Sequence, residues 1–186
     1  MKEISNALEG FLPRSKKDEV FRRDFLALHS TGSFTRSTNP FCHFVVDAFI
    51  VDEDRENTLL IGHRMSGELV FPGGHLEPKE SLLEGTLREV TEETGASRDD
   101  LSEGVLMELA VGFVPLEISW QRKLSPHLHY HICYLFFATK SFRLATEDNG
   151  VTSIGWYPLG SVENSGLRSF HHSRLRLYEE MMTKGS

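Results

Sequence analysis

The sequence predicts an α+β fold, with helices packed on the faces of a mixed β-sheet. Two observations support this class. Apolar, β-branched runs of strand length recur along the chain and are separated by short polar turns. Two other segments, one near the middle and one near the C-terminus, instead carry apolar residues at helical spacing. The length of 186 residues suits one domain with an extension.

Residues 1–39 are predicted to form a helical extension followed by a linker, which leaves residues 40–186 as the main domain. Ser15 is suited to cap a helix, because an acidic residue follows three positions later. Residues 30–40 are rich in Ser, Thr, Gly, Asn and Pro, which is typical of a linker. One face of the helix between them carries Phe21, Phe25 and Leu28.

The central segments alternate between predicted strands and turns. Residues 41–51 are apolar on both strand faces apart from His43 and Asp47, which indicates a strand inside a sheet. The sequence Pro72-Gly73-Gly74 is expected to break the third strand. The predicted strands are 41–51, 58–63, 69–71, 105–113, 128–139 and 151–157.

Two helices complete the predicted domain. For residues 82–94, Ser81 and Glu84 provide a capping box and Gly95 provides the left-handed residue that ends the helix. The apolar stripe expected to dock on the sheet is Leu83, Leu87 and Val90. The C-terminal helix is expected to carry on one side Leu167, Phe170, Arg174, Leu175, Tyr178 and Met182.

Composition and charge narrow the classes of function. With 39% hydrophobic and 25% charged residues, the chain resembles an ordinary globular protein with a core. A net charge of −7 argues against nucleic-acid or anionic membrane partners, which require a basic surface. The sequence contains no apolar run of roughly 20 residues and no signal-peptide pattern, so we expect a cytoplasmic protein. Cys42 and Cys133 are then expected to be free thiols.

An acidic cluster marks the end of the middle helix. Glu89, Glu92 and Glu93 stand at positions i, i+3 and i+4, so they share one face. They repel one another, and the last turn of a helix disfavours acids. Arg88 can pair with Glu84 or Glu92 and orient carboxylates without neutralising the cluster. A solvated acidic face is one interpretation, and a site for Mg²⁺ or Mn²⁺ is the other.

Residues 74–96 resemble the Nudix box, Gly-x5-Glu-x7-Arg-Glu-U-x-Glu-Glu-x-Gly-U, where U is a bulky aliphatic residue. The matching residues are Gly74, Glu80, Arg88, Glu89, Val90, Glu92, Glu93 and Gly95. Ala96 departs from the pattern at the last position, which concerns helix packing rather than chemistry. The resemblance covers residues 41–160 and implies the Nudix-type α/β/α sandwich with a mixed sheet.

The resemblance also implies roles for individual residues. The metal ligands that it implies for Mg²⁺ or Mn²⁺ are Glu89, Glu92, Glu93 and the carbonyl of Gly73. In many relatives the residue at the position of Glu89 activates water, whereas others use an acid from a later loop, here Glu147 or Asp148. Glu80 and Arg88 then orient the cluster.

Histidine and tryptophan residues provide further candidates for the site. His127, His129 and His131 alternate along a predicted strand, so they share a face that can bind zinc or line a substrate pocket. His75 follows the Gly-Gly turn and can approach phosphates, although a surface position is equally compatible. Trp156 is expected in the core rather than stacked on a base. The candidate substrate-binding residues are His75, His129 and Trp120.

The resemblance implies a metal-dependent hydrolase that cleaves a phosphoanhydride bond in a small phosphorylated substrate. We expect a nucleoside diphosphate linked to another moiety, such as ADP-ribose. Nucleoside triphosphates and dinucleoside polyphosphates are the alternatives, and a non-catalytic Nudix-fold binding module is an alternative of another class. No nucleic acid or membrane partner is expected. A homodimer is one way to cover the apolar face of the N-terminal helix.

Overall fold

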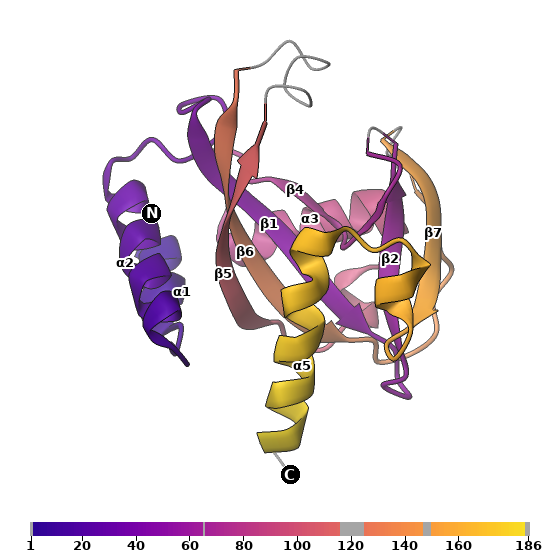
Figure 1. Cartoon of the computed structure of the whole chain (residues 1–186). Helices are drawn as coiled ribbons and strands as arrows, with labels where there is room; N and C mark the ends of the chain where they lie inside the picture. Colours follow the sequence, from indigo (N-terminus) through magenta and orange to yellow (C-terminus); the bar gives the residue numbers. More distant parts are fainter. Residues whose placement is uncertain (1, 65, 116–124, 147–149, 185–186) are drawn as a thin grey trace. The chain divides into compact units, whose positions relative to one another are not determined.

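A computed structural model describes residues 2–64, 66–115, 125–146 and 150–184 (Figure 1). The chain divides into two compact units, each built from three segments. The first unit comprises Met1–Asp47, Gly73–Thr86 and Val105–Tyr134. The second comprises Ala48–Pro72, Leu87–Gly104 and Leu135–Ser186. None of the helices in the described residues is long and apolar enough to cross a membrane.

The described residues form seven strands in one hydrogen-bonded sheet, in the order β3-β2-β1-β6-β5, with β4 paired to β1 and β7 to β2. The strands are β1 Cys42–Val51, β2 Asn57–His63, β3 Leu69–Val70, β4 Gly73–His75, β5 Val105–Val114, β6 His127–Phe137 and β7 Val151–Pro158. The helices are α1 Lys2–Gly10, α2 Lys16–Ser30, α3 Leu82–Thr94 and α5 His172–Lys184.

Hydrogen bonds at both ends of β1 establish that the sheet is mixed. The amide of Leu128 donates to Phe41 O near the start of β1 and β6, and the amide of Ala138 donates to Val51 O near their ends. These two strands therefore run parallel, whereas β1 is antiparallel to β2. The predicted α+β class with a mixed sheet is confirmed.

In the first unit, α1 packs along α2 (Figure 1). Helix α2 begins where the sequence predicts, because Ser15 Oγ accepts a hydrogen bond from the Asp18 amide at 3.1 Å. Its Phe25 is completely buried, with ring centroids 5.5 Å from Phe44 of β1 and 4.9 Å from Tyr130 of β6. The apolar face of α2 thus packs against strands of its own unit. Helix α1 was not predicted, although Ile4 and Leu8, which the structure buries, stand at the helical i, i+4 spacing.

Strand β4 is a second difference from the prediction. The Gly-Gly segment was expected only to break a strand, but Gly73–His75 pairs antiparallel with β1. Its register places His75 opposite Val45 and Gly73 opposite Asp47. The two glycines that were predicted only to end the third strand therefore also pair with β1. Cys42 and Cys133 are free thiols, as predicted.

In the second unit, β2 pairs antiparallel with β3 and β7. Phe49 of β1 packs against Phe71 and against Tyr178 of α5, with centroid distances of 4.7 and 5.3 Å. The C-terminal helix starts at His172, so the prediction that it includes Leu167 and Phe170 is wrong. Leu167 instead forms a parallel bridge with Leu69, which buries its side chain before the helix begins.

The bounds of α3 agree with the predicted residues 82–94. Ser81 and Glu84 exchange the two bonds of a capping box, at 2.8 Å from the Ser81 amide and 3.2 Å from the Glu84 amide. The predicted apolar stripe is only partly correct. Val90 is fully buried, but Leu83 and Leu87 are half-buried, because the helix turns Leu82 and its small residues inward instead.

Candidate active site

In the first unit, the candidate residues of the Nudix-like segment lie in the turn that leads into α3. A side chain at Gly73 is excluded, because a Cβ there would lie 2.8 Å from Asp47 Cα and would also press on Val46 O. Glycine therefore lets the β4 backbone approach β1 closely. The carboxylate of Glu80 accepts a hydrogen bond from the Glu77 amide at 3.0 Å and so holds the loop before the helix.

Gly85 keeps space beside this loop. A Cβ at Gly85 would lie 3.0 Å from Glu80 Oε2 and 2.7 Å from Leu76 Cδ1. A larger residue would push against the carboxylate that closes the loop. Contacts with Leu76 and Glu80 in the first unit thus explain why a residue without a side chain stands at Gly85.

In the second unit, the candidate residues lie in the acidic half of α3. Its three carboxylates differ in burial. Glu93 retains 5% of its exposure and the side chain of Glu89 retains 13%, whereas the side chain of Glu92 retains 49%. The helix therefore turns Glu93 inward with Val90 and leaves Glu92 at the surface. The carboxylates of a merely solvated acidic face stay exposed, so the burial of Glu93 is unusual for such a face.

Arg88 links two of these acids. Its Nη1 atom lies 2.9 Å from Glu89 Oε1 and 3.4 Å from Glu92 Oε2. The predicted pairing with Glu92 is present, and the contact with Glu89 is an additional one. Glu84 accepts hydrogen bonds from the amide of Ser81 as part of the cap, and these lower the pKa of its carboxyl group. The guanidinium group of Arg88 therefore offsets part of the repulsion between Glu89 and Glu92 and orients both carboxylates.

The donor set of α3 fits a hard cation. Carboxylate oxygens are the ligands that Mg²⁺ and Mn²⁺ prefer, and three of them stand within two helical turns. Among the described residues, however, these acids do not form a group in which one potential ligand atom from each residue lies within 4.8 Å of the others. A different set of residues does so. Like-charged carboxylates repel, which keeps their oxygens apart. The residues fit the metal by chemistry and by position on the helix.

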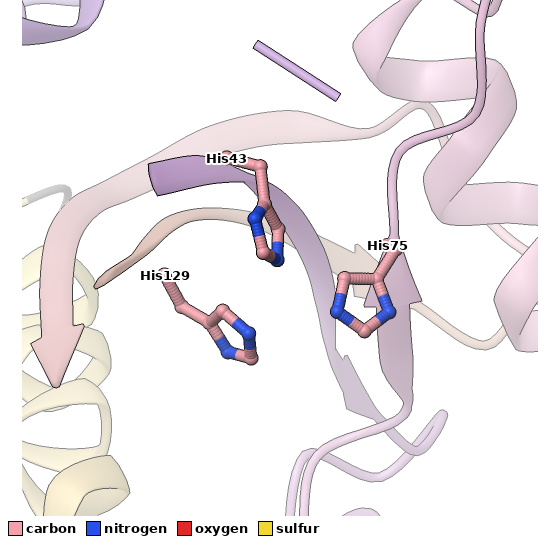
Figure 2. A group of neighbouring side chains, drawn as sticks. All are labelled: His43, His75 and His129. Atoms are coloured by element: carbon pink, nitrogen blue, oxygen red, sulfur yellow. The ribbon is translucent and has the colours of Figure 1, made fainter. Parts of the chain in front are cut away.

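The closely grouped set consists of histidines of the first unit. His43 of β1, His75 of β4 and His129 of β6 point toward one another, with one potential ligand atom from each within 4.8 Å of the others (Figure 2). The predicted trio His127, His129 and His131 does lie along one strand. Only His129 of that trio belongs to this group, because the neighbouring strands supply the other two rings.

The remaining polar groups nearby hold the cluster in place. His131 Nδ1 lies 2.8 Å from Asp47 Oδ2, and His127 Nδ1 lies 2.8 Å from Ser125 O. Sequence reasoning did not assign His43 or Asp47 to any site. The available signal was that these two residues interrupt an otherwise apolar, buried strand, where polar side chains need partners.

Several other candidates have different positions. Trp156 is half-buried rather than in the core, and its ring meets Phe142 edge-on at 5.9 Å in a pocket of the second unit. Trp120, Glu147 and Asp148 lie outside the described residues.

Comparison with known proteins identifies the family. The model of the NUDIX domain matches residues 43–179. A curated relative, the probable DHNTP pyrophosphohydrolase of Lactococcus lactis subsp. cremoris (strain MG1363), is 30% identical over 92 residues, which cover 50% of this chain and 53% of the relative. The match thus spans about half the length of that relative.

Solved structures share the fold at low sequence identity. The NUDIX domain of Shewanella oneidensis NrtR complexed with ADP ribose is 21% identical, with a TM-score of 0.55 over 75% of this chain and 87% of that one. A C. elegans Ap4A hydrolase binary complex is 14% identical, with a TM-score of 0.58 over 76% of this chain and 98% of that one. The chain belongs to the NUDIX family, and its fold is the Nudix α/β sandwich.

Proposed function

We propose that this NUDIX protein is a Mg²⁺- or Mn²⁺-dependent pyrophosphohydrolase. Its preferred substrate is a nucleoside diphosphate linked to a second group, as in ADP-ribose. The observation that carries the proposal is the arrangement on α3, where Glu93 is buried, Glu89 is nearly so, and Arg88 contacts Glu89 and Glu92. A non-catalytic module has no need to retain all four glutamates of the Nudix box, Glu80, Glu89, Glu92 and Glu93.

The reaction adds water across a P–O–P linkage. One new P–O bond forms, the bridging P–O bond breaks, and a proton is released, so that both products end in phosphate. In this proposal Glu89, Glu92, Glu93 and the carbonyl of Gly73 would hold the cations, and Glu89 would also accept the proton of the attacking water. The cations supply charge stabilisation on the diphosphate and leaving group. Glu80 and Arg88 keep the acids in position.

Phosphate and nucleoside recognition is assigned to groups outside α3. His75 and His129 are proposed to contact the substrate phosphates, and Trp120 to stack on its base. The ADP ribose complex of the similar NUDIX domain supports the diphosphate substrate. The Lactococcus relative and the Ap4A hydrolase support a triphosphate or dinucleoside polyphosphate as the second candidate.

Product analysis tests the proposal and separates the candidates. The full chain is incubated with Mg²⁺ or Mn²⁺ and with ADP-ribose, Ap4A or a nucleoside triphosphate, and products are separated by ion-exchange chromatography. ADP-ribose should yield AMP and ribose 5-phosphate at the highest kcat/KM. Release of pyrophosphate from the triphosphate at a higher kcat/KM would favour the second candidate. No cleavage of any of these substrates with either metal would contradict the proposed activity.

A further inference from the structure

The histidine cluster of the first unit combines rings from three strands that are distant in sequence. His43, His75 and His129 have centroid separations of 5.0 Å, 5.2 Å and 5.0 Å for the pairs 43–75, 75–129 and 43–129. Figure 2 shows the three rings turned toward a common space. We propose that they form a binding site for one borderline divalent cation such as Zn²⁺, made by a different set of residues from the acids of α3. A fourth position stays open to an oxygen ligand, and the phosphate contacts proposed for His75 and His129 would then be made through that position.

The hydrogen bonding of His43 prepares one ring nitrogen for a metal. Its Nδ1 atom lies 3.0 Å from the carbonyl oxygen of Asn39, which can only accept, so Nδ1 carries the hydrogen. The lone pair is therefore on Nε2. That atom is buried and has no hydrogen-bond partner among the residues that the structure describes. Histidine ligands in proteins commonly show this arrangement, with one nitrogen bonded to a carbonyl and the other on the metal.

A relay of hydrogen bonds prepares His129 in the same way. The carbonyl of Ser125 accepts from His127 Nδ1 at 2.8 Å, so the neutral His127 ring has its lone pair on Nε2. That nitrogen lies 3.0 Å from His129 Nε2 and accepts its hydrogen. The lone pair of His129 is thereby left on Nδ1. His127 is a positioning residue in this scheme, since it fixes the tautomer of its neighbour.

The ligand type and spacing select the kind of cation. Three imidazole nitrogens suit Zn²⁺ and related transition metals, whereas Mg²⁺ prefers oxygen. Tetrahedral ligands at about 2.0–2.1 Å from zinc lie roughly 3.3 Å apart. In the present structure the potential ligand atoms lie within 4.8 Å of one another, so binding one zinc ion requires them to approach by up to roughly 1.5 Å. Three protein ligands leave one position for water, which is how zinc sites outside purely structural ones are built.

The charge state of the rings suits the binding of a cation. Burial lowers the pKa of His43 to about 4, with His127 and Arg36 acting in the same direction. Burial also lowers the pKa of His129, and the neighbouring histidines lower it further. Neutral imidazole is the metal-binding form.

The test measures Zn²⁺ binding by the full chain after treatment with a chelator. Isothermal titration is carried out in excess Mg²⁺, so that the acids of α3 are occupied by the harder ion. We expect one Zn²⁺ per chain, and Co²⁺ in its place should give the intense visible absorption of a tetrahedral site. Imidazole ¹⁵N spectra should show the rings of His43, His75 and His129 shifting together on addition of Zn²⁺.

Variants distinguish this site from other histidines and from α3. His43→Ala and His129→Ala should each weaken Zn²⁺ binding by about 100-fold or more, and His127→Ala should weaken it by about 10-fold. His63→Gln changes a histidine of the second unit and is the matched control, expected to bind like wild type. Glu93→Gln should also leave Zn²⁺ binding unchanged. Circular dichroism checks that each variant is folded. The ¹⁵N spectra of the histidine rings are recorded on the unmodified chain, so they test the site even where a variant does not fold.

Three outcomes would overturn the proposal. The first is Zn²⁺ binding that survives in both His43→Ala and His129→Ala. The second is loss of Zn²⁺ binding in Glu93→Gln, which would place the ion at the acids of α3. The third is a set of ring signals that ignores Zn²⁺ but shifts with inorganic phosphate, which would make the cluster an anion site.

Discussion

At the scale of single residues, Glu93 and Glu92 show how one helix gives adjacent acids different environments. Glu93 is almost fully buried, while the side chain of Glu92 keeps 49% of its exposure and contacts Arg88. A residue that faces inward cannot rely on water to solvate its charge, so a bound cation or hydrogen bonds must do so. Among the acids of α3, Glu93 is therefore the one whose charge matters most to the proposed metal site.

We predict that Glu93→Gln lowers kcat by about 100-fold or more while the protein stays folded. The amide keeps the shape of the side chain but removes the charge that holds a divalent cation. Steady-state rates at saturating Mg²⁺ provide the measurement, and Glu179→Gln, an exposed change on α5, serves as the control. Near-normal turnover of the Glu93 variant at saturating Mg²⁺ would show that another group binds the metal.

The sequence identified this acidic set because its members are close along one helix. His43 was not assigned, because its partners His75 and His129 lie on other strands and only the fold brings them together. Local spacing was informative for contacts inside one element. Local spacing did not predict contacts between strands that are about 30 and 85 residues apart in the chain.

At the scale of elements, the β1–β2 turn depends on one carboxylate. Asp52 Oδ1 accepts hydrogen bonds from the amides of Glu56 and Asn57 at 2.9 and 3.0 Å, and Asp52 Oδ2 accepts one from the Asn57 side chain at 2.6 Å. Burial raises the pKa of Asp52, but these hydrogen bonds outweigh it and hold the pKa below its ordinary value of 3.8. The folded protein thus favours the ionised form.

We predict that Asp52→Asn lowers the free energy of unfolding at neutral pH by about 1–2 kcal/mol. The unfolded chain binds the proton more readily, so the contribution of Asp52 is complete above its ordinary pKa and is lost as the pH falls through the lowered one. Urea unfolding of both proteins between about pH 7 and pH 3.5 tests this. The difference should shrink toward the acidic end, and a difference that grows there would contradict the assignment.

Several elements were predictable because their signals are local. The caps of α3 define its ends, and β1, β2, β5 and β7 follow apolar runs to within a residue. Strand β4 and the start of α5 were not predictable. Both depend on pairing with distant segments, namely β1 for Gly73–His75 and Leu69 for Leu167.

At the scale of the whole molecule, stability should not depend on metal. The buried residues are predominantly apolar, and many are large, including Phe44, Phe49 and Phe136. We predict that EDTA at neutral pH leaves a cooperative thermal transition within a few degrees of the untreated protein. Differential scanning calorimetry measures this, with EDTA already saturated by Ca²⁺ as the control. Unfolding caused by chelation would instead make a metal site structural.

The N-terminal helices should contribute more to stability than metal does. Removing residues 1–39 exposes Phe44 and Tyr130, which Phe25 now covers, and the loss of that buried side chain alone is worth about 2–3 kcal/mol. We predict a Tm lower by on the order of 10 °C for the truncated chain. Scanning calorimetry gives the Tm, and size-exclusion chromatography shows whether the exposed face causes association. A truncated chain that melts like the full one would mean that the segment is dispensable.

The sequence by itself determined the family, the class of fold and the acidic helix. These depend on composition, on the periodicity of apolar residues and on a motif whose members lie within 23 consecutive residues, from Gly74 to Ala96. Such features are encoded by neighbours along the chain. These features can be recognised without knowing the order of the strands in the sheet.

Only the tertiary structure decided which acid is buried and which histidines meet. The burial of Glu93 follows from the side of α3 that packs inward, which the apolar stripe of the sequence indicated only in part. The group of His43, His75 and His129 follows from β1 lying beside both β4 and β6. Strand order is set by the packing of the whole sheet, so no local pattern in the sequence encodes it.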